Sequence, residues 1–155
     1  MKKLLILAFI LLACILASFY PKNEKQIVQM FSEGTYTIYL NNQLNKIENS
    51  SVSRTNLGDG EILSCKVTEV SSIYDSLIGK KSECVTIAYD EQVLQKVLQQ
   101  ITVKKTEKYD TVKIYYGYKK GLPNKIKIDG YLINIAVYVL QDCIKIASPI
   151  ILTSF

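Results

Sequence analysis

The residues whose types and spacing point most clearly to chemistry are lysines interleaved with tyrosines in the second half of the chain. They are Lys104, Lys105, Lys108, Lys113, Tyr115, Lys119, Lys120 and Lys125. Lysine ammonium groups attract polyanions, and tyrosine rings stack on flat partners. We therefore interpret these residues as a candidate surface for a polyanion or a partner protein. The alternative interpretation is a solvated sheet face whose lysines protect edge strands from aggregation.

The kind of basic residue narrows the choice of partner. Nineteen lysines and arginines against 14 acidic residues give a net charge of +5, and Arg54 is the single arginine. Arginine supplies the planar fork that reads base edges, whereas lysine is a hydrated point charge. Sequence-specific binding of nucleic acid is therefore not expected. The partners predicted instead are an envelope protein or an anionic wall or lipid component.

Catalytic chemistry is restricted because the chain contains no histidine. This excludes serine and cysteine hydrolases with a histidine base, HExxH metalloproteases and Cys2His2 zinc sites. A small hydrolase that uses carboxylates or a lysine base remains an alternative. However, Glu83, Asp90 and Glu91 lie at the ends of predicted elements, where helix capping and dipole effects explain them. The sequence therefore predicts no catalytic residue, metal ligand set or cofactor.

Cysteines offer a third kind of chemistry. Cys14 lies in the apolar N-terminal segment, which leaves Cys65, Cys84 and Cys143 for the folded part. Cys65 and Cys84 fall on two predicted strands, and a disulfide forms between them if those strands are neighbours. The alternative is three buried thiols that act as small apolar core residues. A thiol-redox function is accordingly a third hypothesis.

The N-terminus has the pattern of a targeting segment. Residues 1–3 carry two lysines, residues 4–19 are apolar apart from Ser18, and a polar stretch follows. This pattern is typical of a signal peptide cleaved near Ala17 or of an uncleaved signal anchor. A third interpretation is lipidation of Cys14, because residues 11–14 resemble a bacterial lipobox. All three predict that the chain contacts the membrane through residues 1–20 and that the rest lies outside the cytoplasm, secreted or membrane-anchored.

Two further regions follow the targeting segment. Residues 21–59 are predicted to form a stalk with a short helix near Ile27, one strand over 35–40 and a polar loop over 41–59. Residues 60–155 are predicted to form the compact domain. One domain of this size fits a chain of 155 residues.

The first half of the compact domain alternates strand and helix. Strand patterns cover 61–67 and 83–89. Thr68 is expected to cap a helix that ends at Gly79. Asp90 is expected to cap a second helix, which carries apolar residues at spacings of three and four up to Ile101.

After Ile101 the apolar period changes from that of a helix to that of a strand. Residues 103–108 and 111–118 are expected to form a hairpin, and Asp129-Gly130 predicts a type I′ turn between two further strands. A last strand is expected over 143–147. The predicted fold is therefore α+β, a mostly antiparallel twisted sheet in β-α-β-α order followed by a meander, with both helices on one face.

The last thirty residues carry a resemblance. Residues 129–136, which read DGYLINIA, and 149–155, which read PIILTSF, resemble the ends of small exported proteins of unknown function from Gram-positive, often spore-forming, bacteria. Those proteins have a DG turn, an asparagine in the next strand and a terminal G-x-P-[IL]-I-x-G-S-[FY]. Ala147 and Thr153 stand here in place of the two glycines. The resemblance implies a bacterial extracytoplasmic domain and supplies no activity.

These observations together favour a non-enzymatic binding or structural module of the bacterial cell envelope. The basic, tyrosine-bearing segment and the lack of acid-base machinery support this hypothesis. A hydrolase is expected to show a cleft with perturbed carboxylates, whereas a docking module is expected to show a basic or apolar surface.

Overall fold

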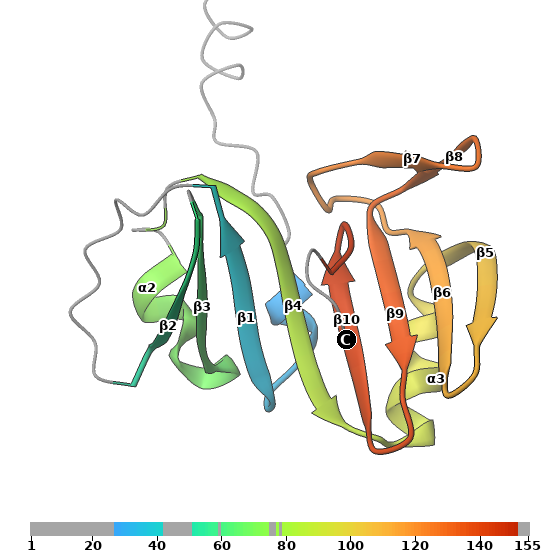
Figure 1. Ribbon diagram of the computed structural model, residues 1–155. Coiled ribbons are helices and arrows are strands. Elements are labelled where there is room, and N and C mark those ends of the chain that lie inside the picture. Colours follow the sequence, from blue (N-terminus) through green and yellow to red (C-terminus); the bar gives the residue numbers. More distant parts are fainter. Residues whose placement is uncertain (1–26, 42–50, 59, 75–76, 78, 152–155) are drawn as a thin grey trace, which may run out of the picture.

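One eight-stranded antiparallel sheet organises the part of the chain that the computed structural model describes, residues 27–41, 51–58, 60–74, 77 and 79–151 (Figure 1). Its strands lie in the order β2-β3-β1-β4-β10-β9-β6-β5, and each neighbouring pair is antiparallel. The strands are β1 (Thr35–Leu40), β2 (Ser53–Leu57), β3 (Gly60–Lys66), β4 (Lys80–Ala88), β5 (Thr102–Tyr109), β6 (Val112–Tyr118), β9 (Ile135–Val139) and β10 (Cys143–Ser148).

Short helices and one small hairpin complete the fold. The helices are the 3₁₀ turns η1 (Ile27–Met30) and η2 (Val67–Glu69), and the α-helices α2 (Val70–Ile73) and α3 (Glu91–Gln99). The strands β7 (Ile126–Ile128) and β8 (Tyr131–Ile133) form a separate two-stranded sheet. In Figure 1 this hairpin lies beyond the ends of β6 and β9.

The two faces of the sheet differ in what covers them. On one side, which we call the helix face, side chains such as Tyr36 and Val85 pack with residues of η1, α2 and α3 into the larger core cluster. On the other side, the open face, a smaller cluster gathers around Tyr39, Cys84 and Tyr138. Alternation along each strand sends successive side chains to opposite faces, so one face can be buried by helices while the other stays less covered.

The α+β class is confirmed: the sheet is mostly antiparallel and its helices are short. The predicted β-α-β-α order followed by a meander is not confirmed in that form. Strand β2 occupies a stretch that was expected to be loop, and β1 pairs on one side with β3 and on the other with β4. The five residues of β2 are all exposed, so no alternation of apolar residues predicts this strand from the sequence.

The expected stalk ahead of residue 60 needs correction for residues 27–40. Ile27 and Tyr36 are fully buried, and β1 lies between β3 and β4 inside the sheet. These residues therefore belong to the same core as the rest. The targeting segment of residues 1–20, with Cys14, lies outside the described residues. None of the helices that the structure describes is long and apolar enough to span a membrane.

Several local predictions are confirmed. Asp90 is the N-cap of α3, and the Asp129-Gly130 turn has positive φ at both residues, 47° and 83°, as a type I′ turn requires. The helix expected at Thr68 starts earlier, as the 3₁₀ turn η2, and Lys66 is its N-cap residue.

Candidate functional site

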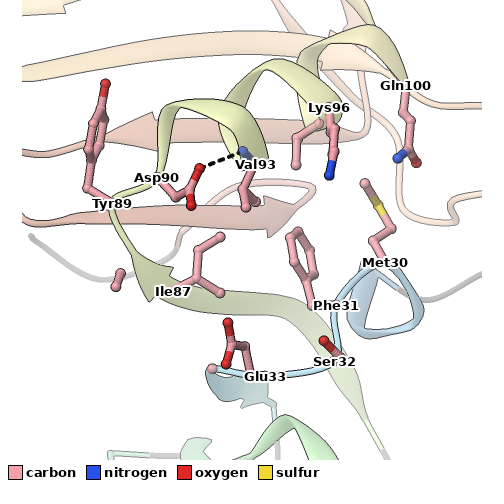
Figure 2. A pocket seen from close by; sticks show the side chains of 13 residues that line it. Met30, Phe31, Ser32, Glu33, Ile87, Tyr89, Asp90, Val93, Lys96 and Gln100 are labelled. Atoms are coloured by element: carbon pink, nitrogen blue, oxygen red, sulfur yellow. Dashed lines mark hydrogen bonds between the residues drawn. The ribbon is translucent and has the colours of Figure 1, made fainter.

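A cleft of about 620 Å³ lies on the helix face between α3 and residues 30–34, which run on from the end of η1 (Figure 2). Met30 and Phe31 project from that segment toward α3, and Lys96 and Gln100 extend from α3 toward them. The lining residues are Met30, Phe31, Ser32, Glu33, Gly34, Ile87, Ala88, Tyr89, Asp90, Val93, Lys96, Val97 and Gln100. Two segments about sixty residues apart in the sequence thus build one concave surface.

The α3 wall is positioned by its cap and its apolar stripe. The Oδ1 atom of Asp90 accepts hydrogen bonds from the backbone N–H groups of Gln92, at 2.7 Å, and Val93, at 3.0 Å. Leu94 and Val97 are buried against the sheet. Because a helix turns 100° per residue, this packing leaves Val93 on the side that faces the cleft.

The opposite wall is held at both ends. At its start, the Ile27 N–H donates to the Oε1 atom of Glu83 at 3.0 Å. At its end, the Gly34 carbonyl accepts from the Val67 N–H at 3.0 Å. Gly34 has φ of +115°, and a Cβ there would lie 2.6 Å from the Thr86 carbonyl oxygen, so only glycine fits this approach to β4. The intervening Met30 and Phe31 are half-buried.

The cleft combines apolar walls with a few charges. Met30, Phe31, Ile87, Val93 and Val97 supply the apolar surface. Lys96 and the carboxylates of Glu33 and Asp90 supply the charges, and the Asp90 carboxylate is already engaged in capping α3. Among these lining residues there is no cysteine, and the chain has no histidine. This chemistry suits the binding of an apolar group that also bears a polar end.

Carboxylates with shifted pKa values lie elsewhere. Burial raises the pKa of Glu83, although hydrogen bonds from the Ile27 N–H and the Tyr36 hydroxyl, the latter at 2.8 Å, oppose the shift. Hydrogen bonds from Gln95 and then Tyr89 lower the pKa of Glu91. Neither residue lines the cleft. The two carboxylates that do line the cleft are those of Glu33 and Asp90, and the Asp90 carboxylate is engaged in capping α3.

The predicted lysine-tyrosine surface is divided between the two faces of the sheet. Lys108 lies directly across from Lys113 on β6, and Tyr115 shares their face, with the Lys113 Nζ atom 4.7 Å from the centre of its ring. Lys105 lies opposite Tyr116 on the open face and forms ion pairs with Glu107 and Asp129. A single basic sheet face is therefore not formed.

The remaining lysines of that prediction have separate positions. Lys104 is exposed and lies where the β5–β6 register shifts. Lys119 donates from Nζ to the Gln100 side-chain oxygen at 3.1 Å, at the end of α3. Lys120 and Lys125 are exposed and flank the segment that leads into β7, with the Lys125 Nζ atom 5.7 Å from the ring centre of Tyr118. These last two belong with the small hairpin and not with the main sheet.

The cysteine prediction is corrected by the topology. Cys65 and Cys84 are both free and buried. Strands β3 and β4 are separated by β1, and Cys65 packs in the helix-face cluster whereas Cys84 packs in the open-face cluster. A disulfide between them would have to cross the sheet, so this arrangement excludes it.

Burial also suppresses the reactivity of these thiols. It raises the pKa of Cys84 to about 12 and is the main cause of the raised pKa values of Cys65 and Cys143. A thiol that keeps its proton at neutral pH is a poor nucleophile. The structure thus offers little support for the thiol-redox hypothesis.

No local sequence pattern marks the cleft residues as one site. Lys96 and Gln100 belong to the polar positions of the Asp90-capped segment, and Met30 and Phe31 belong to the short helix predicted near Ile27. No spacing rule relates residues 30–34 to α3, because the cleft depends on how η1 packs on β4. The capping pattern at Asp90, which predicts the start of α3, is the one sequence signal for a part of the cleft.

Comparison of the chain with protein-family models, curated proteins and solved structures gives no match.

Proposed function

We propose that this chain is an exported, extracytoplasmic binding module of the bacterial cell envelope, and that it holds a partner protein through the cleft between η1 and α3. The partner contributes an apolar side chain with a polar neighbour. The observation that carries the proposal is the pair of half-buried apolar side chains, Met30 and Phe31, that project toward α3 (Figure 2).

The location rests on the sequence. A basic start, an apolar run over residues 4–19 and the resemblance to small exported proteins support export. The net charge of +5 suits a position near anionic envelope components.

Both walls of the cleft are anchored, and one of them carries an adaptable side chain. The α3 wall is fixed by its capped first turn, and the η1 wall is fixed by the hydrogen bonds of Ile27 and Gly34. Between these fixed points, Met30 has an unbranched, polarizable side chain that adapts to the shape of a ligand. A pre-formed cleft with one adaptable wall lowers the entropy that is lost on binding.

The hydrolase alternative would require a reactive group within reach of a bound substrate. Glu83 has a raised pKa, but it is buried in the core and its two oxygens are held by Ile27 and Tyr36. We therefore favour binding over catalysis as the function of the cleft.

Site-specific photo-crosslinking tests the proposal. A benzophenone amino acid at position 31 of the full chain, produced in its native host, is expected to form one dominant adduct. The same amino acid at position 57, which is exposed on β2 at the far edge of the sheet, is expected to form none. Val93→Glu should reduce the adduct at least about tenfold, because a carboxylate is costly to bury against an apolar group.

A matched variant distinguishes an effect on the cleft from an effect on α3 as a whole. Gln92→Glu adds the same charge to α3 at an exposed position that does not line the cleft, and should leave the adduct unchanged. Equal adducts from positions 31 and 57, or an adduct at 31 that Val93→Glu does not reduce, would refute the proposal.

A further inference from the structure

The β7–β8 hairpin exposes large apolar side chains beside several lysines. Tyr131 is 49% and Leu132 43% exposed. In the hairpin register Leu132 lies directly across from Lys127, so an apolar and a cationic side chain share one face. Lys120, Lys125 and Lys127 are all exposed, and none of the ion pairs found among the described residues uses them.

The hairpin is firmly attached to the sheet. Asn134, fully buried, donates from Nδ2 to the carbonyls of Lys119 and Leu122, at 2.8 and 3.1 Å, and accepts from the Lys119 N–H at 2.8 Å. At the tip, Asp129 forms an ion pair with Lys105 of β5. The exposed side chains are therefore presented on an ordered support, so little entropy is lost when they make contact.

We infer that this hairpin binds an anionic lipid bilayer through the face that Leu132 shares with Lys127, with Leu132 entering the headgroup region and Lys120, Lys125 and Lys127 lying over lipid phosphates. Charge complementarity supports this occupant, because each lysine near an anionic membrane surface adds attraction. The exposed Leu132 decides between a bilayer and a wall polymer. Leucine gains nothing from a hydrated polymer, whereas it is favoured at the membrane interface beside lysines.

The inference is independent of what the cleft binds, but it rests on the proposed location beside a membrane. The position of the hairpin fits that location, because the hairpin projects past one end of the sheet (Figure 1). The cleft lies on the helix face. One copy of the domain can therefore contact a membrane and a partner protein together.

The test uses tryptophan fluorescence, because the chain contains no tryptophan. Leu132→Trp and Leu57→Trp are made in the full chain, so that residues 1–26 contribute equally to both. With vesicles that contain phosphatidylglycerol, emission from position 132 is expected to shift to shorter wavelength and to be quenched by brominated lipid. Emission from position 57 is expected to stay at its value in buffer, because β2 lies at the opposite edge of the sheet.

Charge removal gives the quantitative readout. In the Leu132→Trp protein, adding Lys120→Gln and Lys127→Gln should weaken the vesicle affinity read from this emission about 30-fold. Lys108→Gln with Lys113→Gln, two lysines of the main sheet, is the matched control and should change it little.

Three outcomes would overturn the inference: no shift at position 132, an equal shift with phosphatidylcholine alone, or reversal of the shift by soluble teichoic acid with vesicles still present. The last would assign the lysines to a wall polymer. Failure here leaves the cross-link at position 31 unaffected, so the two proposals fail separately.

Discussion

Glu83→Leu is expected to lower the free energy of unfolding by about 3 kcal/mol or more, because it leaves two buried donors, the Ile27 N–H and the Tyr36 hydroxyl, without an acceptor. Glu83→Gln is expected to be at least as stable as the wild type at neutral pH. Its amide oxygen can accept from Ile27 and its NH₂ group can donate to the Tyr36 oxygen, and it removes the cost of a buried charge.

The free energy of unfolding should also depend on pH through Glu83. Burial raises the pKa of Glu83 in the folded protein, so the folded state holds this proton more tightly than the unfolded chain does. The stability from this group is fully present below its unfolded pKa and is lost as pH rises through the folded pKa. The wild type should therefore lose stability as pH increases, whereas Glu83→Gln should lose less.

Urea unfolding followed by circular dichroism measures both effects. The chain has no histidine, so between about pH 5.5 and 7.5 few other side chains titrate and the slope reports mainly on Glu83. Glu33→Gln, at an exposed carboxylate, is the control and should behave like the wild type. Equal losses in Glu83→Gln and Glu83→Leu would contradict the prediction.

Asn134 is expected to be the second most sensitive position. Asn134→Ala removes three hydrogen bonds from a fully buried side chain and leaves the Lys119 and Leu122 carbonyls short of a donor, at a cost of about 3 kcal/mol. Asn134→Asp should be at least as harmful at neutral pH. Its second oxygen would face those two carbonyls, and no donor remains there.

Acidification should separate the two Asn134 variants. Protonation of the new carboxyl restores one donor, so the stability of Asn134→Asp relative to Asn134→Ala should rise as pH falls. Hydrogen exchange should show the loss concentrated in residues 119–133. A pH-independent difference between the variants, or exchange unchanged in that segment, would show that Asn134 does not support the hairpin.

The sequence predicts elements well where one face of an element is buried. The strand expected over 35–40 matches β1, and α3 follows its Asp90 cap, because alternation and capping act within a few residues. The sequence does not predict β2, because all five of its side chains are exposed and only its pairing with β3 makes it a strand. The place of β1 between β3 and β4 was missed because periodicity says which face is buried and not which strands pair.

The site was less predictable for the same reason. Lys105, Lys108 and Lys119 are close in sequence, but strand alternation and the end of α3 send them to three different surroundings. The cleft arises from a tertiary contact between η1 and β4 that depends on the buried Glu83 and on Gly34. The residues next to Glu83 and Gly34 in the sequence form no pattern that predicts this role.

The export proposed for this domain is tested by the intact mass of the natively produced protein in separated membrane, medium and cytosolic fractions. If the domain is exported, we expect either a full-length or Cys14-acylated mass in the membrane or a mass truncated near Ala17 in the medium. A full-length mass confined to the cytosol would contradict export. The cleft would then have to be matched with a partner inside the cell.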